Sequence, residues 1–318
     1  MRNAIPAGLR AVAPLLSGLA LSLLILAAGC DLGKITVSTT SKVLVRAQPS
    51  LKQESSFDMA SRAIPGALKT IEGFWVVDPD NERLTYILME GYCQYGSGFV
   101  EDEWEQAVIA KNFERKDELS TFATKMFLRC MNYALKALGS RWQEGLFGEI
   151  ESAKKLIETA GEDERTALMW AAVGLGSAIN QNKDKPEIFS MLPVAKMMLE
   201  RVVALDASNK PGDPMMAALP HVALGMVFSA VSPQLGGDPK KAEAQFLEAL
   251  KLTGDKFLLA RVFYARRVGV MTQNRDLFRK NLMKVLQTPP SIWPEQRLAN
   301  EIAHRRALRY LKQEKELF

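Results

Sequence analysis

The sequence is poor in the residues that most enzymes use for catalysis. Its 318 residues include only two histidines and three cysteines. It contains no His-Glu-x-x-His helix, Gly-x-Ser-x-Gly turn, Cys-x-x-Cys pair or glycine-rich phosphate loop. A Ser-His-Asp triad assembles in space from distant residues, so this inventory alone does not exclude one. It nevertheless favours a protein that is not an enzyme and that needs no cofactor or metal.

The two histidines have simpler interpretations than catalysis. His221 occupies a core position of an expected helix, so we predict that it packs there. His304 lies in a strongly charged C-terminal segment, where we expect it to be solvated.

A strong charge of either sign is also lacking. The formal net charge is +5, and two of the positive residues, Arg2 and Arg10, lie in a segment that we expect to be removed. This charge is too small to predict a nucleic-acid partner, and no stripe of Lys and Arg with interleaved aromatics is present. A hydrophobic content of 47% with 24% charged residues is typical of a globular chain and excludes a disordered one.

The N-terminus has the pattern of an export signal. Arg2 and Arg10 precede an apolar run, residues 11–28, which ends Ala27-Ala28-Gly29-Cys30. This ending resembles the lipobox of bacterial lipoproteins, so residues 1–29 are the predicted signal peptide and Cys30 the lipidated first residue. The alternative is a transmembrane helix, but a run of about 18 residues is at the lower limit for spanning.

We expect the mature protein to be held at a membrane from the periplasmic side by the lipid on Cys30. Asp31 follows the cysteine, and in some bacteria an aspartate there retains lipoproteins in the inner membrane. The sequence therefore favours the inner membrane and leaves the outer membrane open.

Residues 30–54 are predicted to form the lipidated N-terminus and a tether. Residues 31–53 are polar and β-branched and show no 3.6-residue period. A single helical domain is predicted over residues 55–318.

One spacing recurs along that domain. Buried-type residues occur at offsets of zero, four and seven, which fall on one face of a helix. The four sets are Ala123, Phe127 and Cys130; Ala195, Leu199 and Val202; Ala242, Phe246 and Ala249; Phe278, Leu282 and Val285. Two of these segments follow glycine-containing helices, with Gly174 and Gly225, as in tetratricopeptide-type repeats. The fold prediction is all-α: stacked antiparallel helix pairs.

The expected helices follow from this pattern and from the glycine and proline signals. Helices are predicted over 55–72, 83–98, 117–138 and a linking pair in 142–158, then repeat helices over 164–287 and a capping helix over 294–317. Residues 74–80 are predicted to be a loop, and Gly254 is expected to end a helix.

Two features of the first predicted pair are open to alternatives. Cys93 and Cys130 fall on its two helices, and a disulfide between them is compatible with export; two separately buried thiols are the favoured alternative. The acidic residues Glu101, Asp102 and Glu103 are expected at a helix start, where carboxylates favour the dipole. A cation or partner site is the other interpretation.

Aromatic residues gather in the same region. They are Tyr92, Tyr95, Phe99 and Trp104. Each is expected in a core, yet they are also the candidates for a ligand or partner site. Trp104 is the foremost candidate, because its position after the acidic residues places it near the edge of the stack.

Several stretches resemble one family. LMEGYCQYGSGFVEDEWEQA, PVAKMMLERVVALD, LGGDPKKAEAQFLEAL and the terminal ELF are similar to the T-component family of tripartite ATP-independent periplasmic (TRAP) transporters. That family consists of lipoproteins with degenerate tetratricopeptide-type repeats. The resemblance implies an all-helical body, with a homotrimer as one option, that docks a periplasmic solute-binding protein. It also implies a pore or cavity for small ligands, hydrophobic ones among them.

Two function classes follow. In the first, the protein is a transport accessory that binds a solute-binding protein and its ligand. In the second, it is a repeat-type scaffold for an envelope machine such as a secretion or pilus complex, since stacked repeats offer concave surfaces for either role.

Overall fold

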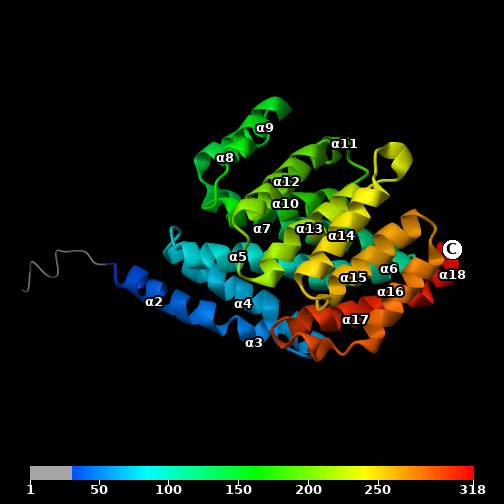
Figure 1. The fold of residues 1–318 in the computed structure, drawn as a ribbon. Helices are drawn as coiled ribbons and strands as arrows, with labels where there is room; N and C mark the ends of the chain where they lie inside the picture. Colours follow the sequence, from blue (N-terminus) through cyan, green and yellow to red (C-terminus); the bar gives the residue numbers. More distant parts are fainter. Residues whose placement is uncertain (1–30) are drawn as a thin grey trace, which may run out of the picture.

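The computed structural model describes residues 31–318, which are helical with no strand (Figure 1). The all-α prediction is therefore confirmed. The predicted signal peptide and Cys30 lie outside the described residues.

Four antiparallel helix pairs form most of the body (Figure 1). The pairs are α5 (Glu82–Tyr95) with α7 (Phe113–Leu138), α10 (Arg165–Gln181) with α12 (Leu192–Ser208), α13 (Pro214–Phe228) with α14 (Pro239–Leu252), and α15 (Leu258–Tyr264) with α16 (Arg275–Gln287). Neighbouring pairs also touch, most extensively where α10 packs on α7.

The residues of the recurring spacing are the ones that close these pairs. All twelve are at most 1% exposed. In the third pair the ring of Phe246 lies against Gly225 of α13 so closely that a Cβ on that glycine would be 2.7 Å from it. Aromatic ring and glycine are thus matched across the interface, because only the smallest residue allows this approach.

Capping residues mark where several helices begin and end. Asp238 and Asn274 accept hydrogen bonds from backbone N–H groups in the first turns of α14 and α16. Gly254 follows α14 with φ +57°, in the left-handed region that favours glycine. The predicted helix end at this residue is therefore confirmed.

Five further helices link and cover the pairs. They are α8 (Ser140–Gly145), α9 (Ile150–Glu158), α11 (Pro186–Phe189), α17 (Arg297–Lys312) and α18 (Glu314–Leu317). Helices α8 and α9 stand at one edge of the body, and α17 runs along the α15–α16 pair (Figure 1). Helix α17 occupies the place of the predicted capping helix, after two short 3₁₀ turns.

The prediction of an irregular tether is wrong for most of its length. Helix α2 (Leu32–Ala47) and the short α3 (Pro49–Lys52) occupy it. Val37, Ser41 and Leu44 repeat the offsets of four and seven, and they face the body. A serine in the middle of that stripe hides the period from a search for apolar residues.

The end of the helix before the predicted loop also differs from expectation. Helix α4 (Phe57–Val77) continues through most of the predicted loop at 74–80. Trp75 explains the extension, because its indole N–H donates to the Thr85 hydroxyl at 3.0 Å and its ring packs edge-on against Tyr133. The loop is reduced to the residues between Val77 and Glu82.

Candidate functional site: an apolar cavity between the inner helices

A cavity of about 300 Å³ runs between the inner helices of the pairs. Helices α3, α4, α5, α10, α12, α13, α15 and α17 all contribute side chains to it. The apolar wall is represented by Leu68, Ile87, Trp170, Leu219, Phe263 and Ile302, one from each of six helices. The volume is at the lower end of the range, ~300–1,000 Å³, of small-molecule pockets.

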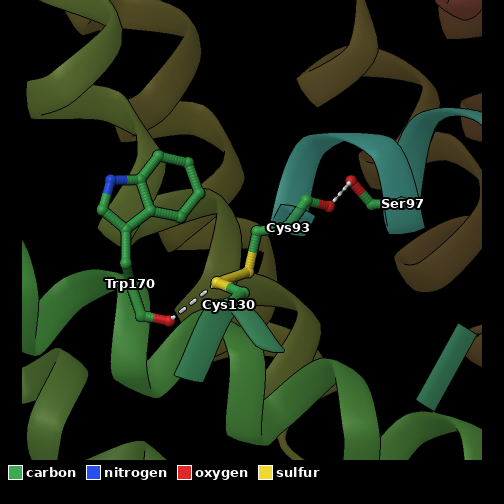
Figure 2. The surroundings of a disulfide bond; sticks show 4 residues. All are labelled: Cys93, Ser97, Cys130 and Trp170. Atoms are coloured by element: carbon green, nitrogen blue, oxygen red, sulfur yellow. Dashed lines mark hydrogen bonds between the residues drawn. A yellow bond between two sulfur atoms is a disulfide. The ribbon is translucent and has the colours of Figure 1, made fainter. Parts of the chain in front are cut away.

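Cys93, in the wall of this cavity, forms a disulfide with Cys130 (Figure 2). The Cα atoms are 5.3 Å apart, within the normal range for a disulfide. The preference for two free buried cysteines is therefore wrong. Sequence spacing did not show that Cys93 on α5 and Cys130 on α7 face each other across the first helix pair.

The surroundings of the disulfide are tightly packed. Figure 2 shows the Cys130 Sγ beside the backbone carbonyl of Trp170, at 3.5 Å, and the Ser97 hydroxyl donating to the Cys93 carbonyl at 3.0 Å. Three helices, α5, α7 and α10, are thus joined behind the wall of the cavity.

The four aromatic candidates separate into three groups. Tyr95 and Phe99 line the cavity, with ring centroids 5.8 Å apart. Tyr92 instead belongs to the core: it stacks on Tyr133, and its hydroxyl accepts a hydrogen bond from Arg129 at 3.0 Å. Only the first two are therefore placed to touch a ligand.

Trp104 is half-buried on α6 (Glu101–Ile109) and packs against the core from outside the cavity. Its indole N–H is buried and has no hydrogen-bond partner within residues 31–318. Helix α6, which carries it, lies near the C-terminal helices α16 and α18 (Figure 1).

The acidic residues do not begin a separate helix. A π-helical turn, Gly96–Val100, joins α5 to α6, and the Glu101 N–H donates to the Gly96 carbonyl. The prediction that these carboxylates stabilise the dipole at the start of a new helix is therefore wrong. Asp102, which is 0% exposed, instead accepts from Arg305 at 2.8 Å and from Arg309 at 2.6 Å, so it fastens α17 to α6.

A cation site at these acidic residues finds no support in the geometry. No group of three or more histidines, cysteines or carboxylates suited to a metal occurs within residues 31–318. The carboxylate of Glu105, two residues after the triplet, accepts from the Tyr310 hydroxyl at 2.6 Å and from Arg309.

One end of the cavity is polar, where the C-terminal end of α10 meets the start of α6. Glu101, Asn180 and Lys183 line this polar end, and Arg267 lies behind it, with its guanidinium 3.4 Å from the Asn180 side-chain oxygen. Sequence reasoning missed Asn180, Lys183 and Arg267, because nothing in their spacing relates them to Glu101.

Burial changes the ionisation of these groups. It raises the pKa of Glu101, although Arg306 opposes that shift. Burial, together with the charge of Arg267, lowers the pKa of Lys183 to about 8. Burial also lowers the pKa of Arg267. The polar end therefore holds charges that its surroundings destabilise.

Both histidines are held by hydrogen bonds. The half-buried His221 pairs with Gln245 through Nδ1 at 2.7 Å, which suits a packing role. His304 is also half-buried, and its Nε2 lies 2.8 Å from the Thr288 carbonyl oxygen, so the expectation of a solvated ring is wrong. Neither lines the cavity.

Comparison with known proteins decides the family. The TRAP transporter T-component family matches residues 53–318. The chain belongs to this family. Its members are accessory components of TRAP transport and are membrane-associated in the periplasm, which agrees with the resemblance noted in the sequence.

A relative supports the extent of the match. The chain is 24% identical over 306 residues to an uncharacterized protein of Treponema pallidum (strain Nichols), covering 91% of this chain and 92% of that protein. Within residues 31–318, no helix of this T-component is long and apolar enough to span a bilayer.

Proposed function

We propose that this T-component docks a periplasmic solute-binding protein and holds that protein's small, hydrophobic ligand in its cavity. The observation that carries the proposal is the cavity of about 300 Å³, with side chains from all the inner helices of the stack and an apolar wall. The family match supports the transport context. No reaction chemistry is needed for such a role.

The docking surface is assigned to the outer face of α6 and the start of α7. Val108 and Ile109 on α6 and Phe113 on α7 are exposed, Phe113 by 70%. Val108 lies one turn after Trp104, so the two share a side of the helix. Trp104 serves as the anchor of this surface, because partly exposed aromatics at an interface contribute much of its binding energy.

The docking surface and the polar end of the cavity are neighbours. Glu101, which lines the polar end, is three residues before Trp104 on α6. A solute-binding protein seated on α6 would therefore stand beside the part of the cavity where Lys183 is exposed, and a ligand would have a short path between the two proteins.

The lipid on Cys30 holds the assembly at the membrane. Asp31 has a second use besides the predicted sorting, since its carboxylate caps α2 through the Gly33 N–H at 3.0 Å. Folded structure thus begins immediately after the proposed lipid. Replacing Cys30 with Ala is expected to abolish labelling by radioactive fatty acid and release the protein from membranes. Continued labelling of the Cys30→Ala variant excludes this anchor.

A pull-down from detergent-solubilised membranes tests the function. Mass spectrometry is expected to find a TRAP solute-binding protein and a small apolar molecule bound to this chain, and light scattering decides whether the particle is the homotrimer that the resemblance suggested. Recovery of secretion or pilus proteins in place of the solute-binding protein would support the scaffold alternative.

A further inference from the structure

The outer face of α2 is exposed and has no partner within residues 31–318. Five residues at successive offsets of three or four share this side of the helix: Leu32, Ile35, Thr39, Val43 and Arg46. The three apolar ones are at least half exposed, Val43 by 60%. Val37 and Ser41 occupy the opposite side, which is buried in the body. Helix α2 therefore turns an apolar stripe outward, along one edge of the body (Figure 1).

The last turn of α4 extends this apolar surface beside the start of α2. Val76 and Val77 are exposed there, by 67% and 45%. Val77 lies next to Gly33 of α2, since a Cβ on that glycine would be 3.3 Å from the valine side chain. The exposed apolar surface is therefore widest at the end of α2 that follows Cys30.

The charges of this segment are all positive. Residues 32–52 contain no carboxylate and carry these cations: Lys34, Lys42, Arg46 and Lys52. Lys52 pairs with Glu90 at 2.7 Å, whereas the other three are exposed and form no ion pair within residues 31–318. The preceding carboxylate, Asp31, is engaged in capping α2. Exposed apolar side chains combined with unpaired positive charge are typical of helices that bind an anionic membrane surface.

The distance of this surface from the proposed lipid selects its partner. Helix α2 begins at Leu32, two residues after Cys30. A lipid on Cys30 therefore holds the start of α2 within about 7 Å of the bilayer, the length of two extended residues. A second copy of this chain is a poorer partner, because a symmetric contact would bring the cations of two α2 helices together.

We propose that the outer face of α2 lies flat on an anionic phospholipid bilayer. Its apolar stripe enters the headgroup region, and Lys42 and Arg46 contact lipid phosphates. The inference rests on the lipid anchor of the proposed function and goes beyond it, because a lipid alone tethers the chain without fixing its orientation. Helix α3, which follows α2 and contributes Leu51 and Lys52 to the cavity wall, would then also lie close to the bilayer.

A fluorescent label at Val43 distinguishes a flat α2 from an upright one. Val43 is eleven residues after Leu32, so in an upright helix it would stand about 16 Å above the bilayer. Cys93 and Cys130 are joined in the disulfide, so Val43→Cys gives the lipidated chain one free thiol for the fluorophore NBD. In phosphatidylglycerol vesicles, nitroxide-labelled lipids are expected to quench this label at least threefold more than a label on Leu235→Cys, an exposed control site between α13 and α14.

The charges give a second readout. Lys42→Gln/Arg46→Gln is expected to lower the quenching at Val43→Cys at least twofold, and molar salt or phosphatidylcholine vesicles should do the same. Lys154→Gln/Lys155→Gln removes the same charge from exposed positions on α9 and is the matched control, which should leave the quenching unchanged. Equal quenching at Val43→Cys and at the control site, or quenching that the α2 double variant does not alter, overturns the inference.

The unlipidated Cys30→Ala chain separates the α2 surface from the anchor. At low ionic strength it should sediment with phosphatidylglycerol vesicles at least tenfold more strongly than with phosphatidylcholine vesicles, and Lys42→Gln/Arg46→Gln should remove this difference. If the difference is found but the wild type takes up no fatty acid, the anchor is wrong and the α2 surface stands. If the wild type is lipidated but the difference is absent, the anchor stands and the α2 surface is wrong. A smaller particle of the double variant in light scattering would assign this face to a second copy and would also overturn the inference.

Discussion

At the scale of residues, the match between Phe246 and Gly225 shows how a helix pair is closed. The Phe246 ring is 0% exposed, touches the backbone of α13 at the glycine, and is 6.3 Å from the ring of Tyr264 between centroids. Glycine and aromatic ring are complementary, so neither can be changed alone without leaving a void or a clash.

Replacing Phe246 with Ala tests this packing. The variant should lose about 3–5 kcal/mol of unfolding free energy, because a buried ring is removed from a site that can collapse only in part. Leu247→Ala on the same helix is the control, since Leu247 is 48% exposed; it should change stability little. Chemical denaturation of both variants measures the difference. A loss below about 1 kcal/mol for Phe246→Ala contradicts the packing.

At the scale of elements, sequence reasoning succeeded where a helix is closed by apolar residues. The twelve residues at offsets of zero, four and seven all reach the core. It failed at α2, where Ser41 interrupts the row of apolar residues. It also failed at α6, because a π-helical turn joins α5 and α6 into one continuous helix. The cavity was expected from resemblance, but its polar end joins α6, α10 and the turn after α15, and distances between such distant segments leave no periodic signal.

The ion pairs between α6 and α17 give a prediction at this scale. Asp102→Asn removes the buried carboxylate that pairs with both Arg305 and Arg309, and Arg309, whose side chain is 11% exposed, keeps Glu105 as its remaining charge partner. We expect a loss of about 3 kcal/mol, at the low end for a buried pair because Arg305 is partly exposed and can turn to water. Glu103→Gln, at an exposed ion pair with Arg115, should leave the melting temperature nearly unchanged. Equal melting of the two variants would refute the role of Asp102.

The disulfide between α5 and α7 gives another. It closes a loop with a sequence separation of 37 residues, so the Cys93→Ala/Cys130→Ala variant should lose about 2–4 kcal/mol. Adding reductant should lower the melting temperature of the wild type and leave that of the double variant unchanged. Two free thiols counted in the unfolded, unreduced wild type would show that the bond does not form.

At the scale of the whole molecule, the fold places each proposed task in a different part of one stack. The α5–α7 pair and its disulfide form one wall of the cavity, Glu101 of α6 and Asn180 of α10 line its polar end, and α6 carries the half-buried Trp104. The sequence pattern gave Trp104 as a candidate for partner binding, and the family resemblance gave a solute-binding protein as the expected partner. Only the structure shows that α6 contributes Glu101 to the polar end of the cavity.

The affinity of the mature chain for the solute-binding protein of its own TRAP system tests the central claim most directly. Surface plasmon resonance should detect binding at micromolar concentration or tighter. Trp104→Ala should weaken it by about 2 kcal/mol or more while the melting temperature stays nearly constant, with exposed Leu308→Ala on α17 as a control that changes neither. No association of the wild type at micromolar concentration would contradict the account, and a sharp fall in melting with unchanged affinity per folded molecule would place Trp104 in the core instead of the interface.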